Sequence, residues 1–151
     1  MIGDSKERPH QRLDAWRDAM ELAALVYAYS AGFPAEERYG LTAQMRRAAV
    51  SVPSNIAEGA ARRYAPELVR FLLIARGSLS ELDTQLALAP RLGLAAPDQD
   101  LLQLLDRTFA RLNALIRSID DTAAARDEPA YYELPMTNHE ITGPIPCSIK
   151  S

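Results

Sequence analysis

Apolar residues recur at three- and four-residue intervals in four stretches of the chain, a spacing typical of amphipathic helices. The first stretch, residues 13–31, carries two neighbouring apolar stripes. The stripe that we expect to face the core consists of Leu13, Trp16, Met20, Ala23 and Tyr27. The other stripe consists of Ala19, Leu22, Val26, Tyr29 and Phe33. Together they are wider than one neighbouring helix covers, so we interpret the second stripe as a candidate oligomer interface.

The second predicted helix begins at Tyr39 or Gly40, ends near Arg63 and contains a proline in its interior. Pro53 lacks an N–H group and its ring crowds the carbonyl of Ala49, so a kink is expected there. The core side of this helix carries Leu41, Met45, Ala48, Val52 and Ile56. Another face carries a polar stripe at helical spacing, made of Gln44, Arg47, Ser51, Asn55, Glu58 and Arg62.

Two further helices are predicted by regular heptad seams. The third helix opens at Pro66 and its seam consists of Leu68, Leu72, Ala75, Leu79, Leu82, Leu86 and Ala89. Pro90 is expected to bend or fray its last turn. The fourth helix begins at Pro97 and Asp98, and its seam consists of Leu102, Leu105, Phe109, Leu112, Ile116 and Ile119. Such seams on helices joined by short loops predict an all-α fold, an up-and-down antiparallel four-helix bundle over residues 13–126.

The two ends of the chain have a different composition from the predicted bundle. Residues 1–12 are polar and are expected to form a flexible N-terminus. Residues 127–151 hold four of the ten prolines and are expected to form an extended, disordered C-terminal tail. The N-terminus lacks the apolar core of a secretory signal, and the longest apolar run, 22–29, is too short to span a bilayer. We therefore expect a cytoplasmic protein with no membrane partner.

The charged residues leave two interpretations open. The chain has a net charge of −3, which is unlike the strongly basic domains that coat nucleic acid. Only Lys6 and Lys150 are lysines among its 17 basic residues, and the arginines include two adjacent pairs. These pairs, Arg46 with Arg47 and Arg62 with Arg63, are candidate contacts for nucleic acid or a protein partner. Alternatively, they belong to solvated helix faces.

Residues that could support catalysis are few. His10 and His139 lie outside the predicted helices, and Cys147 is the only cysteine, so we expect no metal and no cofactor. Glu58, three residues after Asn55, could act as a base, but its spacing from Arg62 is that of a helical ion pair. We therefore expect a protein that is not an enzyme.

Residues 33–63 and 71–93 resemble the bacterial family named for 23S rRNA intervening-sequence proteins. The shared elements are Tyr39-Gly40-Leu41, Gln44, Arg46-Arg47-Ala48, Ser51-Val52-Pro53, Asn55-Ile56-Ala57-Glu58-Gly59, Gly77-Ser78 and Glu81-Leu82. The resemblance covers roughly residues 13–120. It implies a four-helix bundle that associates with itself as a ring-like pentamer and has no established enzymatic activity.

The same resemblance extends to the accessory variability protein of diversity-generating retroelements. That relative binds nucleic acid and a reverse transcriptase through a basic surface, whereas the present chain is acidic overall and poor in lysine. We therefore expect a non-enzymatic, homo-oligomeric interaction module of the pentameric type. The alternative is a nucleic-acid-binding accessory protein that contacts RNA or DNA through the arginine pairs of the second helix.

Overall fold

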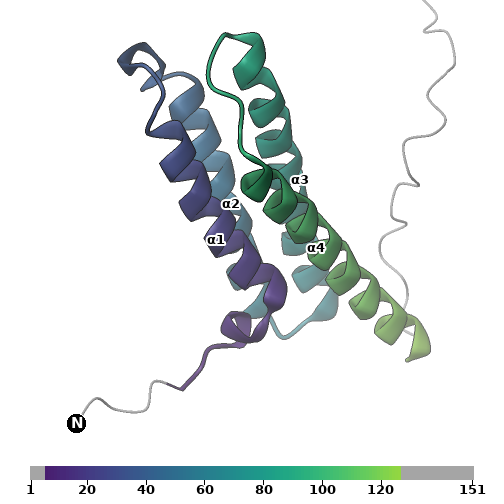
Figure 1. Cartoon of the computed structure of the whole chain (residues 1–151). Coiled ribbons are helices and arrows are strands. Elements are labelled where there is room, and N and C mark those ends of the chain that lie inside the picture. Colours follow the sequence, from purple (N-terminus) through teal and green to yellow (C-terminus); the bar gives the residue numbers. More distant parts are fainter. Residues whose placement is uncertain (1–5, 127–151) are drawn as a thin grey trace, which may run out of the picture.

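Four long helices pack side by side in the computed structural model, which describes residues 6–126 (Figure 1). Their bounds are α1 Asp14–Ser30, α2 Leu41–Ala60, α3 Ala65–Arg91 and α4 Gln99–Ala125. Two short 3-10 helices, η1 Pro9–Arg12 and η2 Ala35–Glu37, precede α1 and α2. Successive long helices run in opposite directions (Figure 1). The predicted all-α, up-and-down bundle is therefore confirmed.

The core lies where the predicted seams of α2, α3 and α4 meet one apolar stripe of α1. The fully buried seam residues include Met45, Val52, Ile56, Leu72, Leu79, Leu82, Leu86, Leu112 and Ile116. Each such side chain contributes roughly 1.5 to 3 kcal/mol through the apolar surface that it removes from water. On α4 the first turns are rotated relative to the prediction, because Leu101 and Leu104 are buried while Leu102 is only half-buried.

Local sequence explains how α3 ends and α4 begins. α3 continues through Pro90 to Arg91, and Gly93 then adopts a φ of 79°, which favours glycine. This turn allows the N–H of Leu94 to donate to the carbonyl of Ala89 at 3.0 Å. Asp98 caps α4, since its Oδ1 accepts from the N–H of Leu101 at 2.8 Å.

α2 and α3 are the most closely packed pair of helices. A Cβ atom on Gly59 would lie 2.9 Å from Cβ of Phe71 and 3.2 Å from the carbonyl oxygen of Leu68. A larger residue at position 59 would therefore force these helices apart. α2 itself continues without a break through Pro53. The kink expected at Pro53 stays a prediction.

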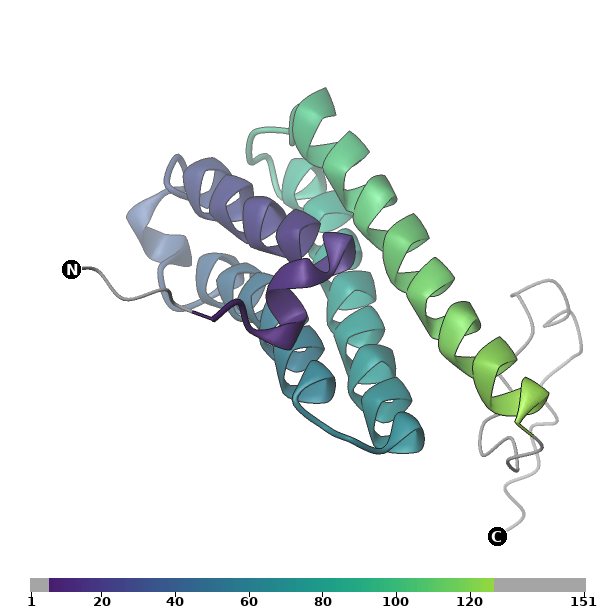
Figure 2. The ribbon, with the colours of Figure 1, turned by 90° about the horizontal axis from the view of Figure 1, so that it is seen from below.

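The folded unit begins earlier than the sequence predicted. Residues 9–12 form η1, which packs against both α1 and α2 (Figure 2). The His10 ring lies 5.0 Å from the Trp16 ring, measured between centroids. Residues 9–12 of the stretch 1–12, which the sequence led us to expect as flexible, thus form a 3-10 helix in contact with α1 and α2. The expectation of a disordered tail over residues 127–151 lies outside the described residues.

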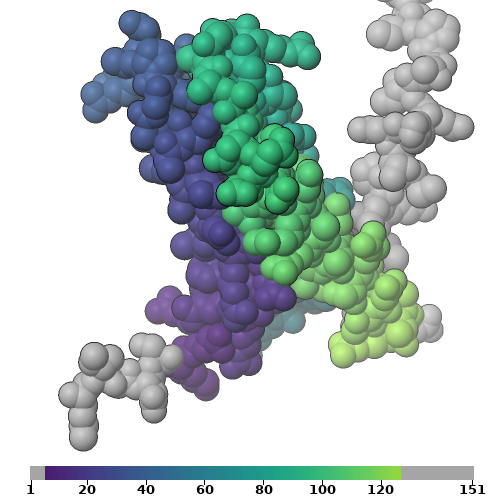
Figure 3. Space-filling view, in the orientation of Figure 1, coloured from purple at the N-terminus to yellow at the C-terminus, as the bar shows by residue number. Residues whose placement is uncertain are grey.

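α4 diverges from the other three helices, and its C-terminal end extends away from them in both ribbon views (Figures 1 and 2). Side chains nevertheless close the space between α1 and the first part of α4 (Figure 3). Within residues 6–126, no helix combines the length and the apolar character needed to cross a bilayer.

Candidate interaction surfaces

An apolar groove of about 500 Å³ runs between α1 and α2. From here on we call it the α1–α2 groove; its lining residues are His10, Trp16, Met20, Ala23, Ala24, Tyr27, Val50, Pro53, Ser54 and Ala57. The lining combines small and large side chains, and none of its residues is acidic, a lysine or an arginine. Met20, Tyr27 and Val50 are 47%, 45% and 43% exposed. The groove is therefore a contiguous apolar surface in contact with solvent.

The groove reverses the predicted roles of the two stripes on α1. Ala19, Leu22 and Val26, which the sequence suggested as an oligomer interface, are at most 1% exposed and belong to the core of the single chain. The stripe expected in the core lines the groove instead, through Trp16, Met20, Ala23 and Tyr27. Because both stripes have the same spacing, only the positions of α2 and α4 decide which one is buried.

The last two residues of the misassigned stripe hold the C-terminal end of α1 in place. The Tyr29 hydroxyl donates to the carbonyl of Ala95 in the connection between α3 and α4. Burial raises the pKa of the Tyr29 phenol. The Phe33 ring packs edge-on against the Tyr29 ring at 4.9 Å. Tyr29 and Phe33 therefore make contacts within the single chain, as Ala19, Leu22 and Val26 do.

Arg46, a predicted contact for nucleic acid, is committed to the bundle. Its Nε donates to Oγ of Ser30 at 2.8 Å, and one terminal nitrogen donates to the carbonyl of Tyr27 at 3.3 Å. Its guanidinium also lies 4.5 Å from the centre of the Tyr27 ring. These contacts lie at the last turn of α1, where the negative end of the helix dipole favours a cation. Arg46 thus has partners within the chain, and its role as a contact for nucleic acid or a protein partner stays a prediction.

The other three predicted arginines lie at the surface. Arg62 pairs with Glu58 at 3.2 Å, as the helical spacing predicted, and its guanidinium lies 5.1 Å from the centre of the Phe71 ring. Arg47 and Arg63 are exposed and form no ion pair within residues 6–126. Of the four, Arg47 and Arg63 are thus the ones available for a partner.

Part of the polar stripe on α2 joins this helix to α3. Ser51 and Ser78 share a hydrogen bond of 2.8 Å between their hydroxyl oxygens, and the Asn55 amide donates to the Ser51 carbonyl and hydroxyl. Gln44 and Glu58 remain exposed. The stripe is therefore divided, with Ser51 and Asn55 in the seam between the helices and Gln44 and Glu58 facing solvent.

The structure adds an ion-pair cluster between α1 and α4 that the sequence analysis missed. The Asp18 side chain, only 5% exposed, accepts from Arg107 at 3.1 and 3.2 Å and from Arg111 at 2.8 Å. The hydrogen bond to Asp18 raises the pKa of the Arg107 guanidinium. Asp18 lies among apolar residues in the sequence, and this position could have indicated a buried ion pair. Spacing along the sequence could not identify its arginine partners, because they lie on another helix.

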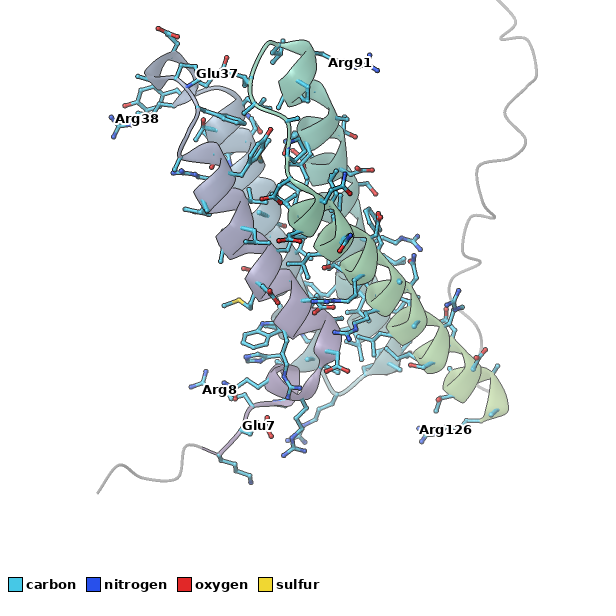
Figure 4. All side chains as sticks on the ribbon, viewed as in Figure 1. Glu7, Arg8, Glu37, Arg38, Arg91 and Arg126 are labelled. Carbon is cyan, nitrogen blue, oxygen red and sulfur yellow. The ribbon has the colours of Figure 1, made fainter. Side chains whose placement is uncertain are left out.

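Charged side chains also occupy the two ends of the bundle (Figure 4). Glu37, Arg38 and Arg91 lie at one end, and Glu7 and Arg8 lie at the other. No group of three or more histidine, cysteine or acidic side chains gathers within residues 6–126 in a way that could hold a metal ion. Within residues 6–126, the candidate interaction surfaces are therefore the α1–α2 groove and the exposed arginines.

A comparison with protein families matches residues 11–116 to the family described as 23S rRNA-intervening sequence protein. The chain belongs to this family. The family match includes the α1–α2 groove apart from His10, together with both arginine pairs and the Asp18 cluster. A search among curated proteins finds no match.

Proposed function

We propose that this member of the 23S rRNA-intervening sequence protein family is a non-enzymatic, homo-oligomeric interaction module that acts in the cytoplasm. The observation that supports the proposal best is the α1–α2 groove. Its exposed aromatic, methionine and valine side chains form one patch, and contiguous apolar patches of this kind commonly mark interfaces. A pentamer is the assembly that the family resemblance implies.

The proposal assigns no catalytic role to Glu58, the residue with the best case for one. Glu58 is exposed, and its carboxylate pairs with Arg62 at 3.2 Å. A general base is usually held in a cleft, where burial or a neighbouring charge brings its pKa closer to neutrality. The surroundings of Glu58 resemble those of an ordinary surface ion pair.

Light scattering after size-exclusion chromatography tests the proposal. The wild type should have a mass several times the 16.7 kDa of one chain. Met20→Glu, which places a charge in the groove at an exposed position, should give a folded monomer. Leu92→Glu is the matched control, because Leu92 is 54% exposed and lies outside the groove. A wild-type monomer at micromolar concentration would contradict the proposal.

A second candidate function is nucleic-acid binding through Arg47 and Arg63. One observation favours it: the acidic excess of the chain lies outside the described bundle. Residues 6–126 contain sixteen basic and fifteen acidic residues, whereas residues 127–151 contain four acidic residues and one lysine. The bundle is therefore less acidic than the whole chain, and a local arginine contact with phosphate is compatible with its charge.

A further inference from the structure

The chemistry of the α1–α2 groove restricts what can fill it. The groove presents apolar and aromatic side chains to solvent, and its lining includes no acidic residue, lysine or arginine. A charged side chain placed there would lose its water without gaining a partner of opposite charge, which is costly. A segment that fills the groove should therefore be apolar and uncharged over the whole length that it covers.

The sequence that follows α4 contains a stretch that meets these requirements. Residues 141–149 include three isoleucines and two prolines but no acidic residue, lysine or arginine. By contrast, residues 127–140 hold all four acidic residues of the chain beyond α4. The charge pattern therefore favours residues 141–149 as the occupant, and from here on we call them the C-terminal segment.

The rings in the groove suit the prolines of the C-terminal segment. His10, Trp16 and Tyr27 line the groove, and aromatic-lined grooves commonly bind proline-rich segments. Pro144 and Pro146 restrict their own φ angles. The segment therefore loses less conformational entropy on binding than a segment without proline would lose.

The isoleucines of the C-terminal segment have a spacing that the groove can accommodate. At the polyproline rise of about 3.1 Å per residue, Ile141 and Ile145 would be roughly 12 Å apart. The groove is roughly 16 Å long from Trp16 to Tyr27, at about 1.5 Å per helical residue. Two isoleucine side chains can therefore contact the groove at once.

The chain between α4 and the C-terminal segment is long enough to reach the groove. Arg126, the last described residue, lines the same surface hollow as Ala65 at the start of α3. Ala57, which lines the groove, precedes Ala65 by eight residues. These two alanines are at most about 30 Å apart, because consecutive Cα atoms are about 3.8 Å apart. Residues 127–140 can span up to about 46 Å, which exceeds that distance.

We propose that the C-terminal segment binds in the α1–α2 groove of its own chain. Its isoleucines bury apolar surface there and its prolines pack on the aromatic rings. The segment then competes with any second copy of the chain for the groove. If it occupies the groove in about nine of ten chains, the apparent affinity for a second copy falls about tenfold. This effect on assembly rests on the proposed function, whereas the contact of the segment with the groove does not.

The wild-type chain carries a pair of probes for this contact. Trp16 lines the groove and is the only tryptophan, and Cys147 lies in the C-terminal segment and is the only cysteine. A nitroxide attached to Cys147 quenches tryptophan fluorescence at close contact, so Trp16 should be quenched in the labelled chain. An excess of the double variant Trp16→Phe, Cys147→Ser, which carries neither probe, should leave the quenching unchanged, because the contact forms within one chain.

Two further variants test which part of the chain makes the contact. Ile145→Asp places a charge in the C-terminal segment, so it should abolish the quenching and lower the concentration needed for assembly about tenfold. Leu134→Asp is the matched control, because Leu134 lies before the segment, and it should preserve the quenching. Circular dichroism verifies that each variant is folded.

The outcomes separate this inference from the proposed function. The inference is overturned if Trp16 is not quenched in the labelled wild type, or if Ile145→Asp is quenched equally. Quenching that is lost on adding the probe-free chain would place the segment in the groove of another copy and overturn the inference as well. Light scattering of the same samples tests the proposed function separately. A chain that is quenched but monomeric at every concentration would retain the contact and contradict the proposed function.

Discussion

Arg46 and Arg47 are adjacent in the sequence, yet the bundle gives them different surroundings. Arg46 contacts the end of α1 through Ser30 and the Tyr27 carbonyl, whereas Arg47 is exposed. Neighbouring positions on a helix point about 100° apart, so an adjacent pair rarely shares one role. Sequence alone presents both as equal candidates for phosphate contact, because it does not reveal which of them faces the preceding helix.

The first prediction separates the two arginines by stability. Arg46→Gln should lower the free energy of unfolding by about 1 to 2 kcal/mol, because it removes two hydrogen bonds and the contact with the Tyr27 ring. Arg47→Gln is the matched control and should change it by less than about 0.5 kcal/mol. Urea unfolding followed by circular dichroism measures both. Equal effects of the two substitutions would contradict the role assigned to Arg46.

The second prediction concerns Asp18, the buried carboxylate between α1 and α4. Asp18→Asn should lower Tm by several degrees, because the amide removes the charge and turns an N–H group towards the arginine donors. Glu21→Gln is the control, since Glu21 is 63% exposed and lies 3.8 Å from Arg107. Differential scanning calorimetry should show little change for the control. A Tm for Asp18→Asn equal to that of the wild type would show that the cluster adds nothing to the α1–α4 contact.

At the scale of the elements, α2 and α3 form the tightest pair because small residues line their contact. Gly59 lies against Phe71, and Ser51 shares a hydrogen bond with Ser78. The sequence analysis placed Ser51 and Asn55 on a polar stripe facing away from the core. The structure shows that α3 covers part of this stripe, which explains why serines rather than longer polar side chains occupy the contact.

The third prediction compares two glycines in helices of this pair. Gly59→Ala should destabilise the bundle by about 1 to 3 kcal/mol, since its Cβ would overlap Phe71 and Leu68. Gly77→Ala should instead stabilise the monomer by up to about 1 kcal/mol, because alanine favours the helix and meets no neighbour there. Both are measured by urea unfolding in the Met20→Glu background, so that assembly does not contribute. Destabilisation by Gly77→Ala would reveal an unrecognised contact within the chain.

At the scale of the whole molecule, charge is unevenly distributed between the bundle and the last 25 residues of the chain. The net charge of −3 includes Asp127, Glu128, Glu133 and Glu140, all beyond α4. A net charge counted over the whole chain therefore overstates the acidity of residues 6–126, which hold sixteen basic and fifteen acidic residues. This matters for the second candidate function, because phosphate contacts depend on local rather than total charge.

The fourth prediction tests nucleic-acid binding. If Arg47 and Arg63 contact phosphates, affinity for single-stranded RNA should fall with salt, with a log–log slope of about −0.7 per contact. The double variant Arg47→Gln, Arg63→Gln should then bind more weakly to all sequences alike and show a flatter slope. Fluorescence anisotropy with two unrelated RNA sequences measures this. Absence of binding by the wild type at low salt would exclude the function for this chain.

The sequence by itself determined the helices and most of the core, because both depend on local regularities. The heptad seams of α3 and α4 placed Leu72, Leu79, Leu112 and Ile116 in the interior, and the structure buries all four. Proline and glycine near residues 90–97 marked the connection between these helices. Spacing of three and four residues dictates which side chains share a face, whatever the rest of the chain does.

Only the tertiary structure decided which of two equivalent faces is buried and which polar residues meet. Both stripes of α1 have helical spacing, so the choice between Leu22 and Met20 for the core depended on where α2 and α4 pack. The same is true of Asp18, whose arginine partners lie 89 and 93 residues further along the chain. Contacts between helices depend on the rotation and crossing of each pair, and one-dimensional periodicity does not contain that information.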